Sequence, residues 1–403
     1  MATLAVGSFE LVLTWEGLRQ TVGLGNGSVV AVARASPGVR SSANQGTTWS
    51  SATGPNNLNA VASAGGGIVI AGADNDLYRS TDSGVNWSSS VFNQVAGIFQ
   101  DLLDLGGGEM LATASAVATQ NTKIYYSSDA GANWSLRATI GDSWIQNFVS
   151  SGGGIIVGVG QTYTDGSGYY GRIFRSTDAG QNWSAGGPYG DLTWFQDIAL
   201  WPTAGKIWAS GRNSSFDYSV YQSTDEGATW NVKNTGNYFA LGASSDETLL
   251  FWGTLADVVY QSTDEGTTTS LVEDFGGSGD YTRFLTEAES DYVFAVVNRG
   301  SVDDTLWRAI YSSSAARKSD MKKHPLSGAK AHVYNASGTI RLQWFEPGSL
   351  TPDATVDILT AQGTLSPAIE WEADGRLRLC LSDGSTRKES ATPWILASWG
   401  NWT

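Results

Sequence analysis

Residues Ser80 to Trp87 read Ser-Thr-Asp-Ser-Gly-Val-Asn-Trp, and the pattern Ser-x-Asp-x-Gly-x-x-Trp recurs in six near-copies along the chain. We call these eight-residue segments the boxes. The earliest box has Asn44 where the others have Asp, and the last has Thr269 where the others have Trp. The boxes begin at Ser42, Ser80, Ser127, Ser176, Ser223 and Ser262. Because the pattern keeps one form, it indicates a single structural unit used many times.

The spacing of the boxes suggests what that unit is. Successive boxes are separated by as few as 38 residues (Asn44 to Asp82) and as many as 49 (Asp129 to Asp178), which is typical of four-stranded propeller blades. A second repeat, in which turn residues precede a short apolar run, indicates hairpins that lead into buried strands. It occurs seven times, at 27–32, 65–70, 106–111, 152–157, 205–208, 246–251 and 291–296. We therefore predict an all-β fold containing a seven-bladed β-propeller.

The seventh blade lacks a box of its own. Ile310–Ala315 stands in the place of one but has lost both the Asp and the Gly. The alternating segment Ser8–Trp15 precedes the first blade, and we predict that it supplies the missing outer strand. Such closure removes the exposed sheet edges that would otherwise pair with other chains. We assign residues 1–320 to the propeller.

Each box occupies a turn between two predicted strands, and its residue types suit that place. Asp and Asn side chains accept hydrogen bonds from backbone N–H groups in turns, and Gly adopts a positive φ at little steric cost. Trp adds apolar surface for packing between strands. We therefore interpret one position of every box as structural rather than catalytic: Asn44, Asp82, Asp129, Asp178, Asp225 and Asp264.

Several boxes of this form in one chain resemble the Asp-box, or bacterial neuraminidase repeat, propellers. The resemblance covers about residues 18–315, and it implies the propeller fold. That superfamily includes sialidases, xyloglucan-degrading glycoside hydrolases, sortilin-type receptors and photosystem assembly factors, so it implies no single function. Sialidases carry an Arg-Ile-Pro motif before the first box. Its nearest match here is Arg172-Ile173-Phe174, and sialidase activity is therefore not expected.

Composition excludes several classes of function. A net charge of −15 and a pI near 4.5 disfavour nucleic acid and anionic membranes as partners. Cys380 is the only cysteine, which rules out an intrachain disulfide and a cysteine-based metal site. The two histidines, His324 and His332, follow the repeats, so no Ser-His-Asp triad is expected on the ring. We predict neither a metal nor a cofactor. The first residues do not resemble a secretory signal, and no apolar run is long enough to span a membrane.

The repeat stops near Met321. Residues 321–325 are interpreted as a linker, and 339–345 and 374–381 as strands that follow Ser-Gly and Asp-Gly turns. We assign 321–403 to a small β-rich C-terminal domain. Its last residues, Trp394–Thr403, are strongly apolar. They suit either a final strand docked on that domain or a contact in a larger assembly.

The starts of the predicted inner strands carry the best candidate surface, because the innermost strand of a blade begins near the mouth of the axial channel. Three blades share an aromatic-polar motif there, with Phe99, Trp144 and Trp194 as its aromatic residues. Aromatic faces can stack on sugars while amides bind sugar hydroxyl groups. The predicted ligand-binding residues are Phe99, Gln100, Trp144, Gln146, Asn147, Trp194, Gln196, Tyr238 and Arg283. The alternative is that these residues only pack between blades.

Two functions are the main hypotheses. The first is a non-enzymatic adhesin or virion component, with a carbohydrate- or receptor-binding propeller and a C-terminal domain that binds other tail proteins. A surface rich in Gly, Ser, Thr, Asn and Trp, without an export signal, is typical of bacteriophage tail proteins, which reach the cell exterior by lysis. The second is a glycoside hydrolase that acts on a cell-surface polysaccharide, with Asp101 and Asp197 as its two carboxylates. A third, an intracellular assembly scaffold like the photosystem factors, fits the acidic surface, but those factors typically act after export, which the first residues do not support.

Overall fold

The computed structural model describes the following residues: 5–6, 9–24, 27–51, 54–92, 97–116, 120–164, 168–187, 189–201, 205–236, 238–244, 249–276, 281–289, 292–299, 303–312, 319–323, 330–336, 339–345, 354–359, 367–371, 377–381 and 387–390. All of the regular structure in these residues is β-strand, and none of it is a helix that could cross a membrane. The chain divides into two units. One is Val6–Ile310, and the other is Tyr311–Thr403 together with Met1–Ala5.

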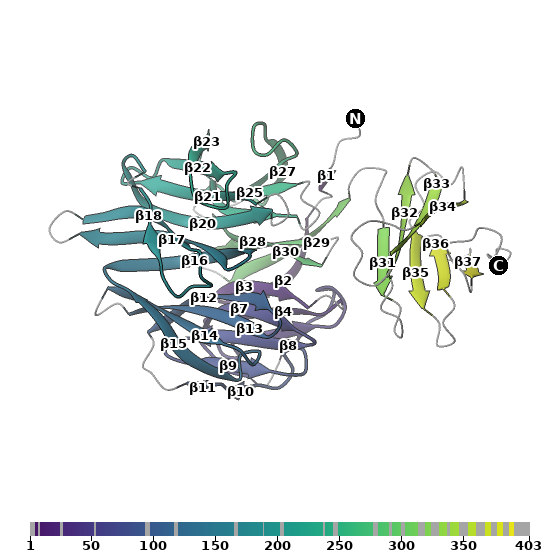
Figure 1. The fold of residues 1–403 in the computed structure, drawn as a ribbon, viewed down its shortest axis with the longest axis horizontal. Coiled ribbons are helices and arrows are strands. Elements are labelled where there is room, and N and C mark those ends of the chain that lie inside the picture. Colours follow the sequence, from purple (N-terminus) through teal and green to yellow (C-terminus); the bar gives the residue numbers. More distant parts are fainter. Residues whose placement is uncertain are drawn as a thin grey trace. The chain divides into compact units, whose positions relative to one another are not determined.

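The first unit is a seven-bladed β-propeller, as predicted (Figure 1). The first blade consists of β3 (Leu18–Gly23), β4 (Val29–Ala33), β5 (Val39–Ser42) and β6 (Ser50–Ser51). The second consists of β7 (Leu58–Gly65), β8 (Ile68–Ala73), β9 (Leu77–Ser80) and β10 (Ser88–Ser89). The third consists of β12 (Ile98–Gly106), β13 (Glu109–Ala116), β14 (Asn121–Ser127) and β15 (Asn133–Ile140), with β11 (Val91–Phe92) parallel to β15.

Three further blades repeat this antiparallel order. The fourth consists of β16 (Ser143–Gly152), β17 (Ile155–Thr164), β18 (Gly168–Ser176) and β19 (Ser184–Ala185). The fifth consists of β20 (Leu192–Trp201), β21 (Lys206–Asn213), β22 (Tyr218–Ser223) and β23 (Asn231–Thr235). The sixth consists of β24 (Tyr238–Ala243), β25 (Leu250–Thr254), β26 (Val258–Ser262) and β27 (Ser270–Asp274).

The seventh blade is built from both ends of the propeller sequence. Its first three strands are β28 (Tyr281–Glu289), β29 (Tyr292–Asn298) and β30 (Asp304–Ser312). Its outer strand is β2 (Glu10–Trp15), antiparallel to β30. The short β1 (Ala5–Val6) also adjoins β30. An ion pair joins Glu10 to Arg308 across the β2–β30 pair. The segment expected to complete the blade, Ser8–Trp15, thus contains β2.

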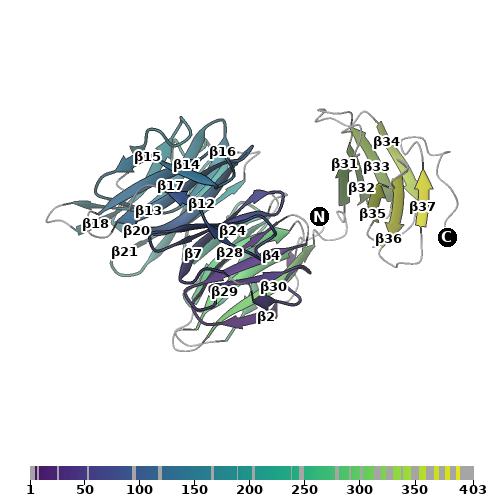
Figure 2. The same cartoon turned by 90° about the horizontal axis from the view of Figure 1, so that it is seen from below.

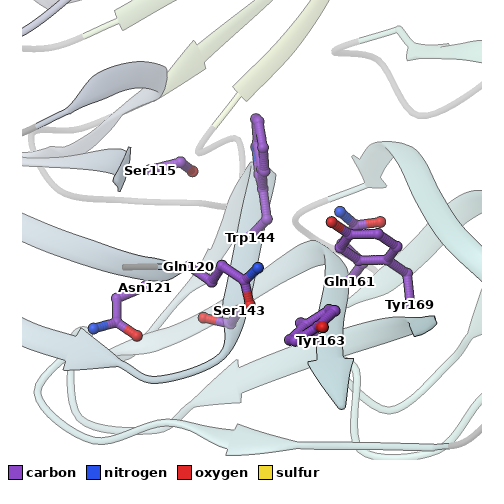
Figure 3. A pocket seen from close by; sticks show the side chains of 8 residues that line it. All are labelled: Ser115, Gln120, Asn121, Ser143, Trp144, Gln161, Tyr163 and Tyr169. Carbon is purple, nitrogen blue, oxygen red and sulfur yellow. The ribbon is translucent and has the colours of Figure 1, made fainter. Parts of the chain in front are cut away.

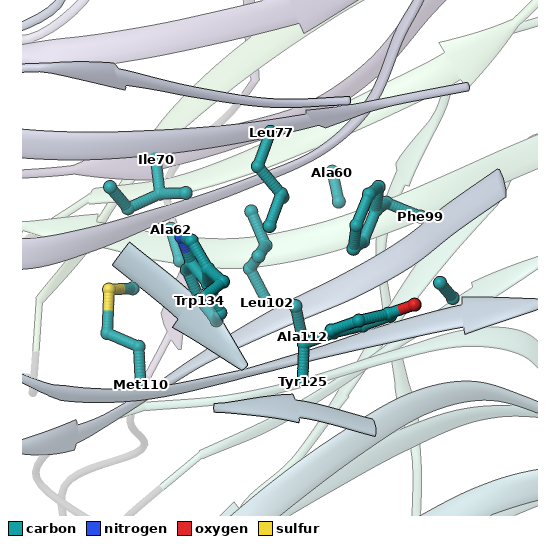
Figure 4. Packing of buried hydrophobic residues seen from close by; sticks show 11 residues of the cluster. Ala60, Ala62, Ile70, Leu77, Phe99, Leu102, Met110, Ala112, Tyr125 and Trp134 are labelled. Carbon is teal, nitrogen blue, oxygen red and sulfur yellow. The ribbon is translucent and has the colours of Figure 1, made fainter. Parts of the chain in front are cut away.

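The inner strands close the ring and enclose the channel. Each of β3, β7, β12, β16, β20 and β24 contacts the next in that order, and β28 contacts β3. The second strand of each blade contains one of the seven predicted apolar runs, and these strands are largely buried. Between the second and third blades, Phe99, Tyr125 and Trp134 pack with aliphatic side chains such as Ile70 and Leu102 (Figure 4). The core therefore consists of clusters between neighbouring blades.

The boxes are turns held together by their own side chains. In the fourth box, the Ser176 hydroxyl donates to Asp178 Oδ1 (2.8 Å) and accepts the N–H of Gly180 (2.9 Å), while Asp178 Oδ1 accepts the N–H of Asn182 (2.8 Å). These donors hold the pKa of Asp178 down at about 2, the backbone N–H of Asn182 being the largest cause. All six boxes share the Ser–Asp (or Asn) bond and the Ser–Gly bond. This geometry gives the Asp a structural task in each turn.

Removing one box hydroxyl should weaken the propeller measurably. Ser176→Ala leaves the buried N–H of Gly180 without its acceptor, so we expect a loss of about 1–2 kcal/mol in the free energy of unfolding. The exposed Ser184, whose hydroxyl donates to the carbonyl of Arg175, is the matched control, and Ser184→Ala should cost less than about 0.5 kcal/mol. Urea unfolding followed by tryptophan fluorescence measures both. Equal losses would show that the box hydroxyl has no special role.

The described residues of the second unit form seven strands in two antiparallel sheets (Figure 2). The first sheet consists of β31 (Ser319–Lys323), β32 (Lys330–Ala336), β33 (Thr339–Phe345) and β34 (Ala354–Leu359). The second consists of β35 (Pro367–Trp371), β36 (Leu377–Leu381) and β37 (Arg387–Ser390). The interpretation of 321–325 as a linker was wrong for residues 321–323, because β31 pairs with β32 there, and residues 324 and 325 lie outside the described ones. Trp394–Thr403 and His324 lie outside the described residues.

Candidate ligand-binding site

Every inner strand of the propeller has a β-bulge near its start. At the bulge one residue has no partner on the neighbouring strand, and such a residue is turned away from the regular alternation of the strand. We call these seven residues the bulge ring. Its members, one from each blade in order, are Arg19, Asn59, Gln100, Gln146, Gln196, Phe239 and Arg283. The repeated bulge therefore presents one side-chain position per blade at the same level of the channel.

Six of these residues line a cavity of about 450 Å³ in the axial channel. Arg283 lies on β28, but its side chain is outside the description. Residues two positions before the bulge also line the cavity (Ile98, Trp144, Trp194 and Tyr281), as do residues one position after it (Gln20, Asn147 and Asp197). Arg34 completes the lining. The site is thus assembled from one repeated local geometry.

Trp144 and Trp194 form the aromatic wall of the cavity. Their ring centroids are 6.1 Å apart and the ring planes are inclined at 46°. The Trp194 indole N–H donates to Gln146 Oε1 (2.9 Å), which fixes the orientation of both side chains. On the next two blades, Phe239 and Tyr281 form a second aromatic pair with centroids 5.0 Å apart. A cavity that combines aromatic faces with amide groups can hold a flat polar ligand by stacking and hydrogen bonding.

Of the nine predicted ligand-binding residues, the cavity brings together Gln100, Trp144, Gln146, Asn147, Trp194 and Gln196.

Phe99 and Tyr238 do not line the cavity. Phe99 is completely buried against Tyr125, and Tyr238 packs on Trp252 with centroids 4.5 Å apart. Both residues come directly before a bulge, whereas Trp144 comes two positions before one. A shift of one residue along a strand moves a side chain to the opposite face. The equivalent of Trp144 in the third blade is therefore Ile98, which does line the cavity.

Sequence reasoning named Arg283 but missed the two arginines that line the cavity, Arg19 and Arg34. Arg19 belongs to the bulge ring, and within the described part of the chain its Nε makes no hydrogen bond. Burial, and repulsion from Arg34, lower the pKa of Arg19 from its usual high value. Arg34 is paired with Asp74 (2.7 Å) at the rim. The alignment of inner-strand starts did not include the first blade, and the bulge register is the signal that identifies Arg19.

A second cavity of about 510 Å³ continues the channel beyond the first and shares Gln20, Asn147 and Asp197 with it. It contains both carboxylates of the hydrolase hypothesis, and each of them bonds to at least one neighbouring blade. Asp197 accepts the N–H groups of Ile198 (2.9 Å) and Leu241 (2.8 Å) and the Asn147 amide (2.8 Å). In the same way, Asp101 accepts the N–H groups of Leu102 (2.9 Å) and Phe148 (3.0 Å). These contacts give both residues a structural role between blades.

Enclosure by protein changes how these two carboxyls titrate. Burial raises the pKa of each to about 7, and the backbone N–H donors oppose that rise. Asp197 is only 6% exposed, whereas Asp101 keeps more contact with the channel, so burial acts more strongly on Asp197. Repulsion from Asp197 adds to the rise at Asp101. The pair is therefore partly protonated near neutral pH.

The described residues contain no group of three or more His, Cys, Asp or Glu side chains that could hold a metal ion.

The comparisons with known proteins show the fold. No family model matches the sequence, and no curated protein matches it either. Among solved structures, YCF48 bound to D1 peptide is 16% identical with a TM-score of 0.58, over 77% of this chain and 100% of that one. YCF48 from Cyanidioschyzon merolae is 15% identical with a TM-score of 0.55, over 75% and 98%. The WD40 β-propeller domain of Doa1 is 11% identical with a TM-score of 0.53, over 74% and 96%. At these identities the likeness extends to the propeller architecture alone.

Proposed function

We propose that this protein is a non-enzymatic binding protein that takes a carbohydrate of a cell-surface glycan or receptor into the mouth of its propeller channel. The observation that carries the proposal is the pairing of Trp144 with Trp194 beside the bulge-ring amides Gln100, Gln146 and Gln196 in one cavity. Tryptophan faces stack on the apolar face of a sugar ring, and amides can both donate to and accept from its hydroxyl groups. The cavity volume of about 450 Å³ is in the range of small-ligand sites.

A glycan array with the purified full chain tests the proposal. We expect binding by the wild type, and a loss of at least about thirtyfold in affinity for the double variant Trp144→Ala/Trp194→Ala, because both stacking surfaces disappear. Leu271→Ala is the control, since Leu271 is 61% exposed on the outer strand β27. No binding by the wild type, or binding unaffected by the double substitution, would refute the proposed site.

For the C-terminal unit we propose assembly into a virion, as part of a phage tail. Two observations support this: the unit has two β-sheets of its own, and the boundary between it and the propeller lies near residue 311. Under this proposal the propeller binds the cell surface and the C-terminal unit binds other tail proteins. Mass spectrometry of purified virions should detect the chain, and deletion of 321–403 should remove it from them. Retention of the truncated chain would exclude this role.

A glycoside hydrolase is the second candidate, because Asp101 and Asp197 line one cavity with pKa values raised to about 7. Such a pKa suits a general acid near neutral pH. Release of reducing ends from a polysaccharide, lost in both Asp101→Asn and Asp197→Asn, would favour the hydrolase. Binding without release favours the adhesin.

A peptide ligand is a third outcome of these tests, since YCF48 is a propeller of the same fold that is bound to a D1 peptide. Peptide binding without glycan binding would replace the carbohydrate in our proposal.

A further inference from the structure

A small pocket lies beside the channel mouth, between the third and fourth blades. Its volume is about 100 Å³. The third blade contributes the end of β13 and the start of β14, and the fourth contributes the start of β16, the end of β17 and the start of β18. The lining residues are Ser115, Gln120, Asn121, Ser143, Trp144, Gln161, Tyr163 and Tyr169 (Figure 3). Trp144 lines both this pocket and the channel cavity, so the two spaces share a wall.

Two buried polar groups around the pocket lack partners. Ser115 Oγ and Trp144 Nε1 make no hydrogen bond within the described part of the chain. The Gln161 side chain, 4% exposed, lines the same pocket and adds a polar amide to it. Buried polar groups in proteins are almost always satisfied, and each one left without a partner costs about 1–3 kcal/mol. Two such groups around one pocket, beside the Gln161 amide, indicate a place built for a polar guest.

The lining also defines the chemistry of that guest. It contains no carboxylate, ammonium, guanidinium or imidazole group, which favours a neutral guest over an ion. The Trp144 indole N–H can only donate, whereas the Gln161 amide can both donate and accept. Tyr163 and Tyr169 add an apolar surface, with ring centroids 5.4 Å apart. The guest should therefore combine an acceptor, a donor and a small apolar end.

Size restricts the choice further. About 100 Å³ holds roughly three water molecules at ~30 Å³ each, which is too little for a whole sugar ring but enough for a substituent of about four heavy atoms. The acetamido group of an N-acetylated sugar has four heavy atoms: a carbonyl oxygen that accepts, an N–H that donates, a carbonyl carbon and a methyl group.

We propose that this pocket binds the acetamido group of an N-acetylated sugar whose ring stacks on Trp144 at the channel mouth. The inference rests on the proposed carbohydrate-binding function and names its substrate class. The acetamido carbonyl accepts from Trp144 Nε1 or Ser115 Oγ, its N–H donates to the Gln161 amide oxygen, and its methyl group contacts the tyrosine rings. The pocket thereby makes the site selective for amino sugars.

Chitotetraose and cellotetraose are the probes, because both are β-1,4-linked glucose-based chains that differ in the group at C2: acetamido in one and hydroxyl in the other. We expect the full-length protein to bind chitotetraose at least about tenfold more tightly by isothermal titration calorimetry, since the acetamido group satisfies two or more buried groups. Gln161→Met, which keeps the side-chain length but removes the amide, should abolish that preference. Gln181→Met is the matched control, because Gln181 is exposed in the fourth box.

The outcomes separate this inference from the proposed function. If the protein binds glycans on the array but shows no preference for chitotetraose, or if Gln161→Met leaves the preference intact, the acetamido pocket is refuted and the binding function stands. A crystal soaked with N-acetylglucosamine is an independent readout. Density for the acetamido group in the pocket supports the inference, and density for ordered water alone overturns it, whatever the array shows.

Discussion

Gly160→Ala should destabilise the propeller by about 3 kcal/mol or more and should also impair ligand binding. Gly160 lies on β17 opposite Ile145, at the bulge of the fourth blade. A Cβ atom at this position would lie 1.8 Å from the carbonyl oxygen of Trp144. Two backbones cannot separate by that amount without breaking the β16–β17 ladder. Because the clash is with Trp144 itself, the indole at the channel mouth should move with its backbone.

Chemical denaturation and the glycan-binding assay, performed on the same protein preparations, measure the two effects. Gly141→Ala is the control, because a Cβ there would meet only the Asn121 Oδ1 at 3.9 Å and the backbone has no positive φ. We expect it to change stability by less than about 0.5 kcal/mol. A Gly160→Ala protein as stable as Gly141→Ala would mean that the close approach of β16 and β17 is not a feature of the protein in solution.

Stability should fall as the pH rises from 5.5 to 8.5. The pKa of the Asp197 carboxyl is about 7 in the folded protein and about 3.9 in an unfolded chain. A raised folded-state pKa means that the folded protein holds the proton more tightly. The resulting stabilisation is complete below about pH 4 and is lost as the pH rises through 7. Between pH 5.5 and 8.5 the expected loss is about 2 kcal/mol from Asp197, with a smaller loss from the more exposed Asp101.

Urea unfolding at the two pH values and constant ionic strength tests this. Asp197→Asn cannot ionise, so it should remove at least half of the pH dependence, although it lowers stability throughout by turning an amide N–H toward a backbone donor. The two histidines lie outside the propeller and do not contribute to its titration. Stability that rises with pH, or an unchanged slope in Asp197→Asn, would contradict the assignment.

The number of blades could be predicted from the sequence because two independent repeats mark the blades and one of them is present in every blade. The Gly-rich turn and apolar run occur in all seven blades, whereas a box occurs in six, so counting boxes alone would have given a smaller ring. Box geometry was also predictable, since Ser, Asp and Gly at fixed spacing can satisfy a turn without help from the rest of the chain. These features are local, and local features can be read from a sequence.

The candidate site was predicted only in part because it depends on register. Aligning the blades on their aromatic residues equated Phe99 with Trp144 and placed Phe99 in the channel. Aligning them on Gln100, Gln146 and Gln196 would have matched Ile98 to Trp144, as the bulges do. No local sequence pattern marks a bulge. Arg34 lines the cavity only because of the way separate blades come together in the ring. Both are properties of the folded ring.

The bulge ring also separates the chemistry of the site from the stability of its scaffold. Each of the seven residues has no cross-strand partner, while the residue before it packs between the blades. Blades with Asn, Gln, Phe and Arg at this position coexist in one ring, so the scaffold accepts different side chains there. A new specificity can therefore arise by single substitutions without repacking the core. This makes the ring a natural starting point for a combinatorial library randomised at seven positions, in which evolution or an engineer can change the ligand while the fold is preserved.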